Sequence, residues 1–186
     1  MPQEDTTKEK EFDLAFGNFI NLVNSWVLGS ITETYRATKH SENNSSPLVA
    51  FILISTTIDF VAGFFEGITD LDNPGNAGRT YKRFLERYMP GYNSENLYKD
   101  LRCKLAHNFT IGASYALIHK RYDMHGKIIP ETGQIIINFE NFYTDFENAI
   151  KAYISDLVKD QDLKSKFLTR YRLGIPAVFQ IKGEIS

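Results

Sequence analysis

The chain has 186 residues, of which 42% are hydrophobic and 24% are charged, and its 21 basic and 23 acidic side chains give a formal net charge of −2. These values exclude an intrinsically disordered chain and a strongly basic nucleic-acid-binding protein, so any contact with phosphates must come from a local basic patch. The length predicts one domain, residues 1–186, with its own hydrophobic core.

Cysteine usage and the apolar segments indicate the cellular compartment. Cys103 is the only cysteine, which excludes an intramolecular disulfide and a zinc site built on several thiolates and fits a reducing compartment. The acidic start of the chain, residues 1–5, does not resemble a signal peptide. The most apolar stretch, residues 48–68, carries Asp59 near its centre and is interpreted as a buried core helix rather than a membrane span. We therefore expect a cytoplasmic protein without membrane contact, metal or other cofactor.

Hydrophobic periodicity predicts six helices along the chain, the first of them long and amphipathic. Ser46 and Pro47 supply an N-cap and a proline at the first helical position for the second helix, which is apolar nearly all round and is expected at the centre of a bundle. Residues 70–78, rich in Gly, Asn and Pro, are predicted to form a loop, and Asn138 is expected to cap the fifth helix. The six helices are predicted at about residues 6–38, 47–68, 79–88, 94–107, 139–157 and 163–172.

The pattern changes between the fourth and fifth helices. Residues 114–121 and 133–138 are predicted to form two short strands, joined by a loop that contains Gly126 and Pro130. They define a β-hairpin insertion at residues 113–138, and a last short strand is predicted at residues 177–182. The predicted fold class is mainly α: a bundle of about five to six helices with a small inserted β-hairpin.

The end of the fourth helix carries the residues most suited to chemistry. Arg102 and His107 are five positions apart, which is about 140° around an ideal helix, so their side chains meet only if the helix ends or distorts there, or if a two-fold axis pairs two subunits. Histidine exchanges a proton near neutral pH, and the arginine fork matches a phosphate. Together they can cleave RNA without a metal, and Asn108 can orient the imidazole or donate to a phosphate oxygen.

The segment Leu101–Asn108 resembles the R-x4-6-H motif of the HEPN superfamily, with Arg102 and His107 as its two defining residues. That family is all-helical and usually dimeric, and it includes many metal-independent ribonucleases in toxin–antitoxin, antiphage and RNA-processing systems. The resemblance covers roughly residues 11–107 and the fifth helix, although only the motif segment is specific, and the hairpin is not part of the minimal family bundle. It implies a homodimer with Arg102 and His107 as the catalytic pair, and RNA, a nucleotide or an antitoxin-like protein as partners.

Other residues are candidates for supporting roles. Asp59 is the acid near the centre of the apolar second helix, and it either pairs with Arg102 or His107 or lies partly exposed at the edge of the bundle. A basic stripe on the third helix can either grip an RNA backbone, with Tyr81 beside it for stacking, or form an ordinary solvated face. The stripe residues considered for RNA binding are Arg79, Lys82 and Arg83.

Two further interpretations of the chain remain open beside the ribonuclease. One is a non-catalytic HEPN-like module that binds a nucleotide, RNA or a protein through the same groove. The other is a purely structural dimeric bundle, in which His107 and Asn108 end the helix and Arg102 forms a surface ion pair.

Overall fold

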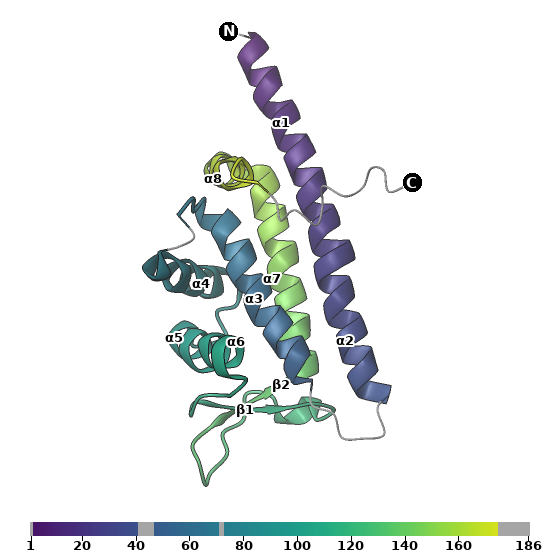
Figure 1. Cartoon of the computed structure of the whole chain (residues 1–186), viewed down its shortest axis with the longest axis vertical. Coiled ribbons are helices and arrows are strands. Elements are labelled where there is room, and N and C mark those ends of the chain that lie inside the picture. The colour runs from purple at the N-terminus through teal and green to yellow at the C-terminus, as the bar shows by residue number, and fades with distance from the viewer. Residues whose placement is uncertain (1, 41–46, 71–72, 175–186) are drawn as a thin grey trace.

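The computed structural model describes residues 2–40, 47–70 and 73–174, and it is mainly helical with one small sheet (Figure 1). The predicted fold class, a helical bundle with a small β insertion, is confirmed. The predicted strand at residues 177–182 and the predicted cap at Ser46 lie outside the described residues. The elements are α1 (Pro2–Asn21), η1 (Leu22–Leu28), α2 (Gly29–His40), α3 (Leu48–Glu66), α4 (Pro74–Tyr88), α5 (Ser94–Asn96), η2 (Leu97–Cys103), α6 (Lys104–Asn108), β1 (Tyr115–Ile118), η3 (Tyr122–Met124), β2 (Ile135–Asn138), α7 (Phe139–Lys159) and α8 (Gln161–Tyr171).

The N-terminal segment forms one long helix from α1 through the π-helical turn η1 into α2. It begins at Pro2, before the predicted start near residue 6, and its N-terminal end extends beyond the rest of the bundle (Figure 1). Its apolar face packs against α3 and α8. The buried side chains on this face include those of Phe12, Ala15, Phe19, Val23 and Ile31.

Helix α3 lies at the centre of the bundle, as its apolar sequence predicted, and it packs against α2, α4, α7 and α8. It ends at Gly67, whose φ of 67° is left-handed. A Cβ at Gly67 would lie 2.9 Å from Cα of Lys166, so the absence of a side chain there lets α8 approach.

Two helical stretches, Thr7–Ala37 and Leu48–Glu66, are long and apolar enough to cross a membrane by length and composition. Core helices of soluble proteins and signal sequences pass the same test, so one or two such helices are weak evidence for a span. In α3, 61% of the most apolar window is buried inside the bundle, whereas the figure is 29% in the N-terminal helix. Burial within the protein therefore accounts for the apolar character of α3 much better than for that of the N-terminal helix.

Helix α4 begins five positions before the predicted start at residue 79, at Pro74. The side chain of Asn73 accepts a hydrogen bond of 3.0 Å from the Gly75 amide, and Pro74 occupies the first helical turn. The prediction of a loop over residues 70–78 was therefore wrong in its second half. The Asn-Pro signal for a helix start outweighed the high content of glycine and asparagine that follows it.

The β insertion is not a hairpin, because its two strands run parallel, with Tyr115 opposite Ile135 and Ile118 opposite Asn138. The connection, residues 119–134, contains η3 and turns back beside β2, where Ile128 and Ile135 form an antiparallel bridge. A connection of this length allows the second strand to start at the same end as the first, which a tight turn does not. Figure 1 shows the insertion at one end of the bundle, beneath α6 and the start of α7.

Asn138 ends β2 and caps α7, as predicted, and its side chain accepts a hydrogen bond of 3.1 Å from the Asn141 amide. The backbone amide of Asn138 donates to Nδ1 of His125 at 3.1 Å, so the neutral imidazole carries its proton on Nε2. That Nε2 faces Oη of Tyr92 at 3.2 Å, and Tyr92 donates to Asp145 of α7 at 2.7 Å. Partial burial lowers the pKa of His125. The imidazole that joins the insertion to the bundle is therefore neutral near pH 7.

Candidate functional site

Arg102 and His107 come together within one chain because the fourth predicted helix is distorted just before His107. The helix runs from α5 through the π-helical segment η2 into α6, and Arg102 lies at the end of η2. A π turn bonds residues five apart and so widens the helix locally. Nη1 of Arg102 lies 3.5 Å from Nε2 of His107. Of the two arrangements considered from the sequence, a distorted helix and a two-fold axis, the distorted helix brings the pair together here.

This contact favours Nε2 as the imidazole nitrogen that can act as a base. The arginine only donates, so Nε2 of His107 is the acceptor and the proton of the neutral ring lies on Nδ1. A separation of 3.5 Å is long for a hydrogen bond, so the lone pair on Nε2 is only weakly engaged. The His107 side chain is exposed, and a hydroxyl group of a ligand can reach that lone pair from solvent.

Asp59 of α3 anchors Arg102 from the side facing the core. Its Oδ2 accepts a hydrogen bond from Nε of Arg102, and the two side chains are only 18% and 21% exposed. Burial raises the pKa of Asp59, and the attraction of Arg102 opposes this shift without cancelling it. Burial alone would lower the pKa of Arg102, but the Asp59 carboxylate together with a smaller effect of Cys103 outweighs burial, and the pKa is raised. The Arg102 side chain also lies over the Tyr98 ring, 5.8 Å from its centroid.

The helix that carries the pair ends at Asn108 and Phe109. Asn108 is exposed, and the structure gives no hydrogen bond between it and the His107 imidazole among the described residues. Phe109 adopts a left-handed φ of 52°, and its amide donates to the Leu105 carbonyl at 3.2 Å, which closes the helix. The Phe109 side chain is nevertheless 68% exposed. Phe109 was not predicted from the sequence as a site residue, although an aromatic residue near a predicted helix end is a visible signal.

Replacing Phe109 by glycine should raise the free energy of unfolding by about 0.5–1 kcal/mol. Glycine adopts the left-handed φ of 52° without strain, whereas the exposed phenyl ring contributes little buried area. Urea unfolding curves of the purified variants give the difference. Phe109→Ala is the matched control, because alanine keeps the Cβ that causes the strain and should show no gain. A glycine variant less stable than the alanine variant would contradict the assignment of strain to this residue.

The basic side chains predicted to bind RNA lie on α4, and each has a partner within the chain. Tyr81, between them in sequence, is fully buried with its ring centroid 5.4 Å from that of Tyr98, so it is not available for the stacking on bases that the RNA-binding alternative included. The basic side chains at residues 79, 82 and 83 therefore already have acceptors within the chain, and Tyr81 gives them no exposed ring on which a base could stack. The acceptors are Asn76 for Arg79 at 2.8 Å, Glu95 for Lys82 at 2.7 Å and Glu66 for Arg83 at 2.7 Å.

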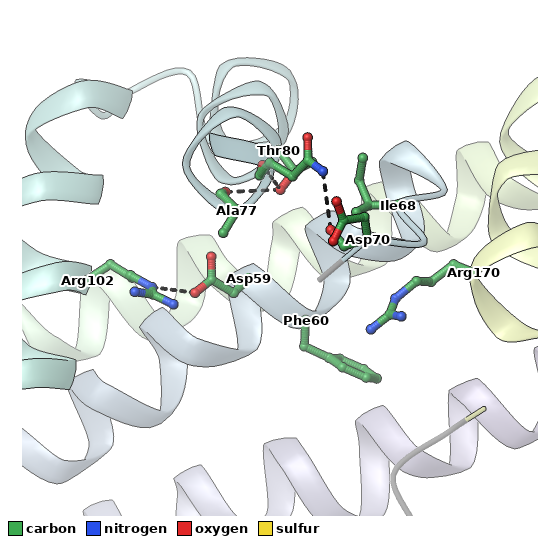
Figure 2. A pocket seen from close by; sticks show the side chains of 10 residues that line it. Asp59, Phe60, Ile68, Asp70, Ala77, Thr80, Arg102 and Arg170 are labelled. Atoms are coloured by element: carbon green, nitrogen blue, oxygen red, sulfur yellow. Dashed lines mark hydrogen bonds and ion pairs between the residues drawn. The ribbon is translucent and has the colours of Figure 1, made fainter. Parts of the chain in front are cut away.

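Arg102 also lines a cavity of about 210 Å³ (Figure 2). Arg102 and Asp59 form one end of this cavity, so the same guanidinium borders the cavity and contacts the exposed His107. Two of the residues that line the cavity, Asp59 and Arg102, were predicted as site residues from the sequence, but no sequence pattern indicated the cavity itself. The residues lining it are Asp59, Phe60, Gly63, Ile68, Asp70, Asn76, Ala77, Thr80, Arg102 and Arg170.

The comparisons with known proteins add no family assignment. No protein-family model matches the sequence, and no match was found among the curated proteins or the solved structures. The resemblance of residues 101–108 to the HEPN motif therefore stays a prediction.

Proposed function

We propose that this protein is a HEPN-like endoribonuclease that cleaves RNA without a metal, with Arg102 and His107 as its catalytic residues. The observation that carries the proposal is the approach of Nη1 of Arg102 to Nε2 of His107, at 3.5 Å, on the exposed end of a distorted helix. A second support is Asp59, which binds Nε of the arginine from the core side and leaves Nη1 beside His107.

The chemistry follows from the two side chains. Nε2 of His107 accepts the proton of an RNA 2′-hydroxyl, and the 2′-oxygen attacks the adjacent phosphorus. The bond from phosphorus to the 5′-oxygen breaks, which leaves a 2′,3′-cyclic phosphate, and the departing 5′-oxygen takes a proton from water. Arg102 donates to the phosphate oxygens on which negative charge increases during the attack. Asp59 does not contact the substrate in this scheme but fixes the orientation of Arg102.

The proposal includes a homodimer. In it, the segment that follows α6 in each subunit lies near the catalytic pair of Arg102 and His107. Its support is an exposed apolar surface directly after His107, formed by Phe109 at 68% and Ile111 at 37% exposure. A second copy of the chain, or an antitoxin-like protein, would cover that surface. Phe109 follows His107 by two positions, so in either case a bound partner would lie beside the proposed catalytic pair.

An RNA cleavage assay tests the proposal. The purified protein is incubated with structured and single-stranded RNAs in EDTA, at a concentration at which its oligomeric state has been measured, and the products are separated on gels and their ends identified. We expect cleavage that leaves cyclic phosphates and that His107→Ala abolishes. His119→Ala, at a second histidine outside the site, is the matched control and should cleave like the wild type. Equal cleavage by the wild type and His107→Ala, or none by the wild type, would reject the proposal.

A non-catalytic binding module is the second candidate. It is favoured by the acceptors that already engage Arg79, Lys82 and Arg83, because these pairs reduce the free positive charge available to a long RNA backbone. Binding of a mononucleotide measured by isothermal titration calorimetry, without cleavage of any RNA in the assay, would select this candidate over the ribonuclease.

A further inference from the structure

The cavity beside Arg102 carries polar groups at both ends. Figure 2 shows Arg102 entering from η2 and Arg170 entering from α8 on the opposite side, with Asp59 and Phe60 of α3 between them. The cavity volume of about 210 Å³ is larger than the ~150 Å³ that encloses a benzene molecule in an engineered cavity, but smaller than the ~300 Å³ at which drug-sized pockets begin. The space thus fits a small metabolite rather than a nucleotide.

Arg170 is a cation without an acidic partner among the described residues. Its Nε is buried and has no hydrogen-bond acceptor, and its guanidinium lies 5.7 Å from the centroid of the Phe64 ring. Burial lowers its pKa, and no carboxylate counteracts that effect. A partly buried cation without an anion lowers the stability of the fold, so an external anion is the partner that this environment lacks.

Gly63 lies in the middle of α3 against this guanidinium. A Cβ at Gly63 would lie 3.4 Å from Nε of Arg170, which is ordinary van der Waals contact, so alanine fits at this position and a side chain longer than alanine would meet the arginine.

The opposite end of the cavity offers an unused acceptor. Oδ1 of Asp59 is buried and has no hydrogen-bond partner, because Arg102 contacts only Oδ2. The hydroxyl of Thr80, between the two ends, is already satisfied by the carbonyls of Asn76 and Ala77 at 3.0 Å each. The cavity is thus flanked by an unpaired donor, Nε of Arg170, at one end and by an unpaired acceptor, Oδ1 of Asp59, at the other. Both atoms are covered by their neighbours, so a ligand reaches them only when those neighbouring side chains move aside.

We propose that this cavity binds a small molecule that has an oxyanion, held by Arg170, and an ammonium, amide or hydroxyl donor, held by Oδ1 of Asp59. The oxyanion is a carboxylate or a phosphate, and both are matched by the guanidinium fork. The site is separate from the exposed face of His107, and the proposal does not depend on ribonuclease activity.

Two pairs of probes test the proposal on the full chain by isothermal titration calorimetry and ligand-induced thermal shift. β-Alanine and O-phosphoethanolamine share the same ammonium and two-carbon spacer and differ in the oxyanion, whereas acetate and inorganic phosphate supply the oxyanion alone. We call β-alanine and O-phosphoethanolamine two-ended, because each has an oxyanion and an ammonium, and acetate and inorganic phosphate one-ended. We expect either β-alanine to bind at least about 10-fold more tightly than acetate, or O-phosphoethanolamine to bind at least about 10-fold more tightly than phosphate, because the two-ended probe contacts both Arg170 and Asp59. The tighter two-ended probe identifies the oxyanion as carboxylate or phosphate.

Arg170→Gln should weaken the binding of that probe by at least about 10-fold and leave the thermal midpoint of the free protein equal or higher. Arg172→Gln is the matched control, because Arg172 is an exposed arginine nearby that pairs with Glu11 outside the cavity. It should bind the probe like the wild type. Absence of binding at millimolar concentrations of all four probes, or equal binding by Arg170→Gln, would overturn the proposal.

Discussion

Arg102→Lys should slow RNA cleavage by about 10²–10³-fold while lowering the free energy of unfolding by less than about 1 kcal/mol. The reason is that Arg102 makes two contacts with different nitrogens: Nε faces Asp59 and Nη1 faces His107. A lysine ammonium is a single point charge and occupies only one of these positions at a time. Asp59 attracts it most strongly, so the charge beside the imidazole is lost first.

Single-turnover cleavage rates with excess protein give the first quantity, and urea unfolding gives the second. Arg121→Lys is the matched control, because Arg121 is an exposed arginine whose partner is Asp123 in the β insertion. It should leave both quantities unchanged. If Arg102→Lys cleaves as fast as the wild type, the guanidinium fork is not the group that stabilises the transition state.

The helices were predicted from sequence because their signals are local. Apolar residues at helical spacing identified the long N-terminal helix, the central helix α3 and helix α7, and a single asparagine, Asn138, correctly marked the start of α7. The start of α4 was misplaced because glycine and asparagine after Pro74 are turn formers by composition. The strand direction in the insertion was wrong because two short strands do not encode the path of the chain that joins them.

The candidate site was predictable only in part, for a related reason. The spacing of Arg102 and His107 identified the pair, but the π turn that lets them meet has no sequence signature in this segment. For Asp59 two alternatives were considered, pairing with Arg102 or His107 and partial exposure at the edge of the bundle. The packing of η2 on α3 places Asp59 against Arg102 and so decides between them. Arg170 was missed altogether, because its place in the cavity depends on how α8 crosses α3 near Gly67, far away in the chain.

Arg102→Gln should lower the free energy of unfolding by about 2–4 kcal/mol near neutral pH, and the double variant Asp59→Asn/Arg102→Gln should recover most of that loss. Removing one partner of a buried ion pair costs about 3–5 kcal/mol because the other charge stays buried and unpaired. The cost is expected below that maximum here, since about a fifth of each side chain remains exposed. In the double variant two neutral amides replace the pair, so no buried charge is left.

The pH dependence of the same variants tests which charge causes the loss. Burial raises the pKa of Asp59, and Arg102 opposes that rise, so Arg102→Gln should raise the pKa further. A carboxyl whose pKa is raised in the folded state stabilises the fold below its unfolded pKa, and this contribution disappears as the pH rises through the folded pKa. The deficit of Arg102→Gln should therefore shrink in mildly acidic buffer, while that of the double variant should not change.

Urea unfolding of the wild type, Asp59→Asn, Arg102→Gln and the double variant completes the double-mutant cycle, and each protein is measured at neutral and at mildly acidic pH. Additive effects at neutral pH, or an Arg102→Gln deficit that does not depend on pH, would show that Asp59 is not the buried charge that Arg102 neutralises. A coupled and pH-dependent deficit would place the ionised Asp59 beside Arg102 at neutral pH. The carboxylate that orients the arginine for His107 would then be the same one whose second oxygen remains free to bind a donor in the cavity.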